Sequence, residues 1–134
     1  MTDAELLALA REARKNAYAP YSGFAVGAAL LTKSGKVYSG CNIENASFSP
    51  TVCAERVALF KAVSDGERDF CALAVVGGRG KTLSPDVTPC GVCRQALAEF
   101  CEGFFRILTE DRDRNPILRT LSDLLPSPFG GPDA

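Results

Sequence analysis

The sequence contains no histidine, so the side chain that most often binds catalytic metals and moves protons near neutral pH is missing. Thiolates and carboxylates must therefore carry any hydrolytic chemistry. No apolar run approaches the roughly 20 residues that span a bilayer, which predicts no contact with a membrane. Excess positive charge is also absent, because 15 basic residues stand against 16 acidic ones. Since polynucleotide binders draw most of their affinity from phosphate contacts, we expect no nucleic-acid partner and a small, roughly neutral substrate.

The start of the chain has no basic segment followed by an apolar one, the pattern of a signal peptide, and this predicts a cytoplasmic protein. The 134 residues are 46% hydrophobic and 23% charged, which is typical of one globular domain. We find neither a linker nor an internal repeat. We therefore predict a single domain over residues 1–134.

Hydrophobic periodicity and turn residues predict the order of the elements. Helices are expected over residues 3–18, 52–63 and 88–101, and strands over 24–32, 37–41, 70–76 and 104–108. Thr51 or Ser49 is expected to cap the second helix, and Thr88 to cap the third. Gly77 is expected to begin a flexible loop, and residues 118–125 read as a helix or as a strand followed by a helix. Strands separated by helices predict an α/β fold, a sheet with helices on both faces that begins with an antiparallel hairpin.

Three of the six cysteines lie in two short segments, Thr51–Arg56 and Pro89–Gln95. Cys53, Cys90 and Cys93 can hold one zinc ion and leave its fourth position to water, the arrangement that separates a catalytic zinc site from a structural one. Cys53 and Cys90 each fall at a predicted helix start, where the helix dipole favours the thiolate. Read alone, the C-x-x-C pair is also compatible with a redox pair or with buried cysteines. The Cys-Ala-Glu segment upstream favours zinc.

Glu55 follows the first predicted ligand by two residues, close enough to exchange protons with a water whose pKa zinc lowers to about 7. Three thiolates overcompensate the charge of the metal, so a cation is expected to donate hydrogen bonds to the sulfurs. Arg56 is the first candidate for this role and Arg94 the weaker one. In isolation, Glu55 would be read as a favourable helix-start residue and Arg56 as an exposed helix arginine.

The order Cys-Ala-Glu, then Pro-Cys-x-x-Cys, resembles the zinc-dependent cytidine and deoxycytidylate deaminases, specifically the small homotetrameric type that acts on nucleosides. Four segments match in order and spacing: residues 21–30, 40–46, 53–56 and 89–95. The resemblance covers nearly the whole chain. It implies a three-layer α-β-α sandwich around a mixed sheet of about five strands, one zinc ion per subunit and a homotetramer.

The resemblance also implies roles for residues that bind the substrate. Asn42 and Glu44 match the pair that hydrogen-bonds the 3′-hydroxyl of the ribose. Phe24 matches the aromatic residue that packs near the pyrimidine, and Ala54 would offer backbone groups to the base. Phe129 resembles the aromatic residue that a neighbouring subunit donates. Without the resemblance, Asn42 and Glu44 would be read as turn residues and Phe24 as a core residue.

Two phenylalanines, Phe48 and Phe129, occupy positions that bear on the site. Phe48 stands where many members of the family have tyrosine, so one hydroxyl group and the hydrogen bond that it could make are missing. Phe129 lies between prolines in an irregular tail, residues 126–132. A large aromatic residue there is either part of a frayed terminus or an anchor on a partner surface. We expect the anchor.

We therefore predict hydrolytic deamination of cytidine and deoxycytidine to uridine and deoxyuridine with release of ammonia, a step of pyrimidine salvage. An activated water attacks C4 of the base, while Glu55 protonates N3 and passes a proton to the departing amine. A deaminase of the blasticidin type shares the zinc core and is the alternative enzyme, although residues 42–45 resemble the ribose-binding loop of cytidine deaminases. A non-enzymatic zinc module would require a fourth protein ligand, for which Cys41, Cys71 and Cys101 are available. The near-neutral charge disfavours a polynucleotide editor.

Overall fold

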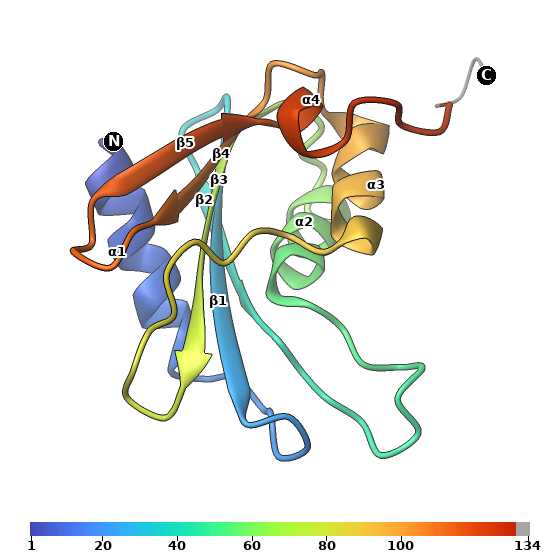
Figure 1. Ribbon diagram of the computed structural model, residues 1–134. Coiled ribbons are helices and arrows are strands. Elements are labelled where there is room, and N and C mark those ends of the chain that lie inside the picture. The colour runs from blue at the N-terminus through green and yellow to red at the C-terminus, as the bar shows by residue number, and fades with distance from the viewer. Residues whose placement is uncertain (131–134) are drawn as a thin grey trace.

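A mixed five-stranded sheet forms the centre of the computed structural model, which describes residues 1–130 (Figure 1). The strands are β1 (Phe24–Thr32), β2 (Val37–Cys41), β3 (Phe70–Arg79), β4 (Arg106–Glu110) and β5 (Pro116–Thr120). The helices are α1 (Asp3–Arg14), α2 (Ala54–Ser64), α3 (Gly91–Phe100) and α4 (Leu121–Leu124). None of the helices in this part of the chain combines the length and the apolar character needed to cross a bilayer.

The strand order is β2-β1-β3-β4-β5. β1 pairs antiparallel with β2 and with β3, and β4 pairs antiparallel with β5. β3 and β4 are parallel, and the chain between them contains α3. Because parallel strands need a crossover connection, this pair forces α3 onto one face of the sheet.

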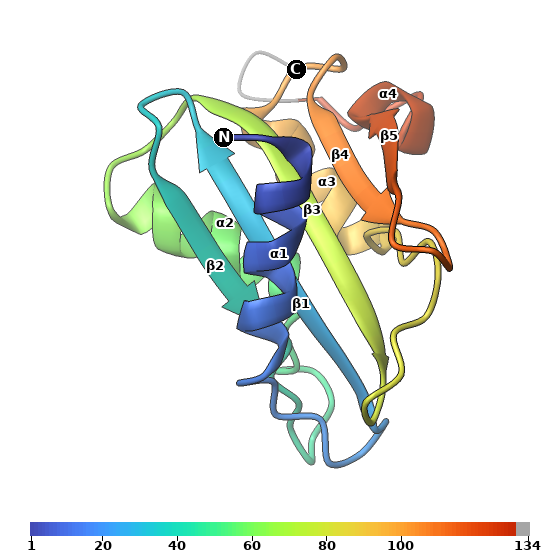
Figure 2. The ribbon, with the colours of Figure 1, turned by 90° about the vertical axis from the view of Figure 1, so that its left-hand side faces the viewer.

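Helices cover both faces of the sheet, as predicted. α1 lies on one face, and α2 and α3 lie on the other (Figure 2). Side chains along β1 alternate between the two layers: Ala28 and Leu30 pack in the cluster with α2 and α3, whereas Ala29 packs in the cluster with α1. Since a strand buried on both faces has no polar side, the period-2 alternation of β1 is hidden in an apolar run. The three-layer α-β-α sandwich with five strands is confirmed.

Gly40 of β2 sets how closely α2 approaches the sheet. A Cβ at this position would lie 2.4 Å from the carbonyl oxygen of Ala54 and 2.7 Å from the backbone nitrogen of Ala58. Real Cβ atoms do not come this close to backbone atoms, so any other residue would push α2 away from β2. The first turn of α2 carries Glu55, and Gly40 therefore fixes the depth at which that carboxylate lies.

Strand β3 is longer than predicted, because residues 77–79 continue the sheet instead of starting a flexible loop. Gly77 and Gly78 pair with Val26 and Ala25 of β1. Arg14, at the end of α1, donates hydrogen bonds to the carbonyl oxygens of Gly78 and Ala25 at 2.7 and 2.9 Å. The predicted loop was wrong because both glycines permit close packing here: a Cβ on Gly78 would lie 2.0 Å from the carbonyl oxygen of Thr82.

Other boundaries also differ from the prediction. α1 ends at Arg14 instead of residue 18, because Tyr18 leaves the helix to pair with Ile43. β4 begins two residues later than expected, after a turn in which the Phe105 nitrogen donates to the Glu102 carbonyl oxygen. The segment 118–125 is a strand followed by a short helix, the second of the two predicted readings. Thr120 starts that helix with a capping box.

Candidate metal centre and active site

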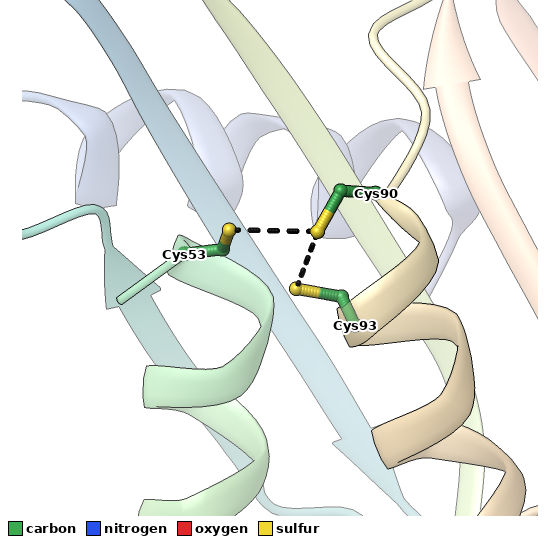
Figure 3. A group of neighbouring side chains, drawn as sticks. All are labelled: Cys53, Cys90 and Cys93. Atoms are coloured by element: carbon green, nitrogen blue, oxygen red, sulfur yellow. Dashed lines mark hydrogen bonds between the residues drawn. The ribbon is translucent and has the colours of Figure 1, made fainter. Parts of the chain in front are cut away.

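Two helix N-termini bring three cysteines together. Cys53 is the N-cap of α2, Cys90 is the N-cap of α3, and Cys93 lies buried on the first turn of α3. The Cys53 and Cys90 sulfurs are 3.7 Å apart, and those of Cys90 and Cys93 are 3.6 Å apart (Figure 3). The expectation that Cys53 and Cys90 fall at helix starts is therefore confirmed.

The predicted caps were wrong, because the cysteines themselves occupy the cap positions. Thr51 Oγ1 instead accepts a hydrogen bond from the Asn45 nitrogen, and Thr88 Oγ1 accepts one from Arg94. Neither cap cysteine uses its side chain to bond the helix backbone. Both sulfurs are thus left for other partners, at positions where the helix dipole favours a negative charge.

The sulfur triangle has the size that a zinc ion requires. A tetrahedral site with Zn–S distances of about 2.3 Å separates its sulfurs by about 3.8 Å. The two distances between hydrogen-bonded sulfurs, 3.7 and 3.6 Å, agree with that geometry. Within residues 1–130, this group holds three ligand side chains and no fourth. Cys41, Cys71 and Cys101 lie outside it, so the fourth position is open, as in catalytic zinc sites.

The close sulfurs shift the pKa values of one another. The hydrogen bond with Cys93 lowers the pKa of Cys53 well below its usual range, and hydrogen bonds from Arg56 and Cys90 lower it further. The pKa of Cys93 is raised, first by its interaction with Cys53 and then by burial. A divalent cation among the three sulfurs favours the thiolate form of each, so metal binding at this site releases protons.

The two arginines proposed to compensate the sulfur charge lie in different surroundings. Arg56 Nη2 donates to Cys53 Sγ at 3.6 Å. Arg94 donates to backbone oxygens instead, Pro89 at 2.7 Å and Leu124 at 2.8 Å. Of the two candidates, only Arg56 directs its guanidinium at a sulfur in this structure.

Glu55 lies in the first turn of α2, and only 4% of its surface is exposed. Burial, together with the smaller effect of the neighbouring Cys53, raises the pKa of this carboxyl group to about 7, against the lowering effect of the Glu55 backbone hydrogen bond. A carboxyl group that titrates near neutral pH can both take up and release a proton at working pH. A buried, perturbed carboxyl group beside a metal cluster is a typical candidate for an acid–base catalyst.

Cys53, Cys90 and Glu55 line one cavity of about 310 Å³, the inner cavity, which is within the size range of small-molecule sites. Four of the five predicted substrate-binding residues line it: Phe24, Asn42, Glu44 and Ala54. A second cavity of about 380 Å³, the outer cavity, shares part of its lining with the first and includes Tyr21 and Phe48. The structure thus joins residues from β1, the 42–52 loop and α2 around one space.

Asn42 and Glu44 hold the walls of the inner cavity in place. The amide of Asn42 accepts from the Val26 nitrogen and donates to the Phe24 oxygen, both at 2.8 Å, so it pairs with β1 as a neighbouring strand would. One oxygen of Glu44 accepts from the Tyr21 and Ser22 nitrogens at 2.9 and 3.0 Å.

Ser22 is a residue of the site that was not predicted from the sequence. Its hydroxyl donates to the other Glu44 oxygen at 2.5 Å and accepts from the Phe24 nitrogen at 3.0 Å. The bonds from Ser22 lower the pKa of Glu44, so the carboxylate stays charged. In the sequence, Ser22 lies in the turn before β1 and within the matching segment 21–30, and neither fact reveals a partner 22 residues away.

The two phenylalanines singled out in the sequence for their positions, Phe48 and Phe129, are both exposed. The Phe129 side chain is 84% exposed and lines neither cavity, so this predicted substrate residue is not brought to the site of its own chain. Phe48 is 72% exposed, adopts a φ of 63° and contacts Tyr21 edge to face at 6.4 Å between ring centroids. Non-glycine residues rarely adopt positive φ, so the loop is held in a conformation that turns Phe48 outward.

Comparison with known proteins gives a consistent result. The family model described as the cytidine and deoxycytidylate deaminase zinc-binding region matches residues 1–107. A cytidine deaminase of Sporosarcina psychrophila is 50% identical over 129 residues, 96% of this chain and 92% of the relative. The crystal structure of cytidine deaminase from Burkholderia pseudomallei superimposes with a TM-score of 0.87 at 44% identity, covering 96% of this chain and 100% of the other. A blasticidin-S deaminase of Bacillus cereus is less similar, at 31% identity over 75% of this chain and 74% of its own.

Proposed function

This chain belongs to the zinc-binding cytidine and deoxycytidylate deaminase family, and from this premise we propose how its residues carry out the reaction. It is an enzyme that deaminates cytidine, with a zinc site formed by Cys53, Cys90 and Cys93. We extend the proposal to deoxycytidine as a second substrate and to a role in pyrimidine salvage. The observation that carries the mechanism is the triangle of sulfurs with the buried Glu55 beside it at the inner cavity.

Glu55 is proposed to move the protons of the reaction. When bound, zinc supplies a water of lowered pKa as the nucleophile. The oxygen of that water bonds to C4 of the base, and Glu55 takes its proton and delivers it to N3. Glu55 then takes the remaining proton of the added oxygen and passes it to the exocyclic amine, the C4–N4 bond breaks as C4 and that oxygen form a carbonyl group, and ammonia leaves. A pKa of about 7 suits both halves of this task, because the group must be an effective base and then an effective acid.

The other residues of the inner cavity orient the substrate and the metal. Arg56 offsets the negative charge of the thiolates through its contact with Cys53, which keeps the metal an effective Lewis acid. Phe24 offers an aromatic surface to the pyrimidine, and the backbone of Ala54 hydrogen-bonds its polar edge. Both line the inner cavity.

Asn42 and Glu44 are proposed to select nucleosides. Each has its side chain fixed by hydrogen bonds and still has hydrogen-bonding capacity for a ribose hydroxyl. A charged carboxylate at the sugar repels a phosphate, so nucleotides should be poor substrates. A base without the sugar would leave both groups unpaired, and such sites disfavour the analogue that lacks the partner.

We propose that the active enzyme is a homotetramer in which Phe129 completes the site of a neighbouring subunit. The exposed Phe129 and the exposed aromatic pair at the outer cavity support this proposal, since large exposed aromatic residues are typical of interface anchors. A single domain over residues 1–134 and a cytoplasmic location remain predictions of the sequence, and residues 131–134 lie outside the described part of the chain.

A panel of five substrates tests the proposal: cytidine, deoxycytidine, cytosine, CMP and blasticidin S. Ammonia release is measured on protein whose zinc content has been determined. We expect turnover of the two nucleosides at one zinc per subunit and weak or no turnover of cytosine and CMP. Efficient turnover of CMP would contradict the role of Glu44. Preference for blasticidin S would favour the aminonucleoside alternative.

A further inference from the structure

The end of the described chain is bound to the helix that carries two of the zinc ligands. Gln95 of α3 donates from Nε2 to the Phe129 carbonyl oxygen at 3.0 Å, and its Oε1 accepts from the Phe129 nitrogen at 3.1 Å. One side chain thus satisfies both backbone groups of one residue. Figure 1 shows the segment after α4 running beside α3.

Arg94, the residue before Gln95, holds the same segment at a second point. It donates to the carbonyl oxygen of Leu124 at 2.8 Å and to that of Pro89 at 2.7 Å. The end of α4 is therefore tied to the residue that precedes Cys90. Between these two anchors, Pro126 and Pro128 further restrict the backbone.

The fixed backbone of Phe129 leaves its side chain mostly exposed within its own chain. Its backbone is held on both sides, yet the ring is 84% exposed. Holding a backbone in one conformation costs entropy, which an exposed ring does not recover. The fixed position becomes useful if the ring enters a surface of another molecule, because a preorganised group loses less entropy on binding.

We propose that Gln95 is a positioning residue that aims Phe129 at the active site of a second copy of this chain. The proposal rests on the function proposed above, in which Phe129 completes a neighbouring site. In this arrangement the first two turns of α3 serve two active sites. Cys90 and Cys93 bind the metal of one subunit, and Gln95 orients the aromatic residue that reaches the active site of the neighbouring subunit. An amide suits this role, because it offers a donor and an acceptor side by side.

Two substitutions of Gln95 separate positioning from folding. Gln95→Met keeps the approximate length of the side chain and removes both hydrogen bonds. Gln95→Glu keeps the acceptor and removes the donor. Glu99→Ala, at an exposed position on the same helix, is the matched control.

We expect Gln95→Met to raise the KM for cytidine about ten- to thirty-fold, with kcat and zinc content close to wild type. Gln95→Glu should lie between wild type and Gln95→Met, and the control should match wild type. Chymotrypsin should cleave after Phe129 faster in Gln95→Met, a measurement that does not depend on activity.

The decisive comparison uses the background Phe129→Ala. If Gln95 acts through the ring, Gln95→Met should change KM little in that background, because the two effects are not additive. Additive effects, loss of zinc, or a Gln95→Met variant as active as the control would overturn the proposal. If Phe129→Ala itself leaves KM unchanged, the contribution of Phe129 to the neighbouring site fails and the proposal for Gln95 fails with it. Inactivity of the wild-type protein on cytidine would instead count against the proposed function.

Discussion

The zinc end of the site comprises Cys53, Glu55, Cys90 and Cys93. Its rim comprises Ser22, Glu44 and Phe48, together with the Phe129 side chain that we propose a neighbouring subunit supplies. The two regions differ in burial and in whether one chain completes them. At the zinc end, Cys93 is fully buried, Glu55 is nearly so, and the three sulfurs and the acid come from two adjoining helix starts. At the rim, Phe48 and Phe129 are mostly exposed, and Phe129 lines neither cavity. One chain therefore supplies all the groups proposed for the chemistry, whereas the proposed contribution of Phe129 to substrate binding requires a partner subunit.

Removal of a metal ligand should have the largest effect. We expect Cys93→Ala to abolish zinc binding and to reduce cytidine turnover to background, because two protein ligands hold zinc poorly in an open site. Zinc content by mass spectrometry and ammonia release measure both effects. Cys71→Ala, which changes a cysteine outside the cluster, serves as the control and should keep zinc. A Cys93→Ala protein with full zinc would show that another residue binds the metal.

Replacement of Glu55, the proposed proton carrier, should have the second-largest effect. Glu55→Gln keeps the size of the side chain and should lower kcat by about 10²- to 10⁴-fold, the usual contribution of general acid–base catalysis. Zinc content should remain at wild-type level, because Glu55 is not a ligand. Turnover within a few-fold of wild type would exclude Glu55 as the group that moves protons.

A change at the rim should have a smaller and more selective effect. Ser22→Ala removes one hydrogen bond to Glu44, and we expect a loss of about fivefold to tenfold in kcat/KM for cytidine. The residual activity on cytosine should stay the same, since that substrate has no sugar to be oriented. An equal loss on both substrates would mean that Ser22 acts on the general structure of the site.

The zinc end could be predicted from the sequence because its residues fall into two short motifs, although Cys53 and Cys90 are 37 residues apart. Cys53 and Glu55 share one helix start, and Cys90 and Cys93 share another, so the combination of the two motifs indicated a common site. Helix caps were predicted wrongly, because threonine is a better cap than cysteine and the metal site reverses that preference. The strand predicted for β3 ended too early, before Gly77, because two adjacent glycines are compatible with a loop as well as with close packing.

The rim could not be predicted in the same way, because the residues that meet there belong to no short motif that indicates a partner. Ser22 meets Glu44 across 22 residues, and Gln95 meets Phe129 across 34. Neither pair has a pattern that local propensity detects. The predicted roles of Asn42, Glu44 and Phe129 came from resemblance to a family, and they remain predictions.

The smallest effect is expected at Arg119 of β5, which lines neither cavity. Its guanidinium binds both oxygens of Asp86 and lowers the pKa of that carboxyl group below its ordinary value of 3.8. Because a lowered pKa stabilises the fold above that value, the contribution is present at pH 7 and is lost as pH falls through the folded pKa. Arg119→Gln should lower the free energy of unfolding at pH 7 by about 1 kcal/mol or less.

Urea unfolding of Arg119→Gln and wild type at several pH values checks this prediction. The difference should shrink as the pH falls below 3.8. If it persists at the lowest pH at which the wild-type protein stays folded, the Arg119 contribution does not depend on the Asp86 charge.

Hybrid oligomers test most directly whether one site takes its chemistry from one chain and part of its rim from another. Glu55→Gln and Phe129→Ala subunits with different tags are co-expressed, and assemblies that contain both are isolated. Some sites then combine Glu55 from one subunit with Phe129 from its neighbour. We predict that the hybrids have a kcat/KM for cytidine above that of either parent. The sites that combine Glu55 and Phe129 should have a KM near that of the wild type. Hybrids whose activity equals the average of the two parents would contradict it.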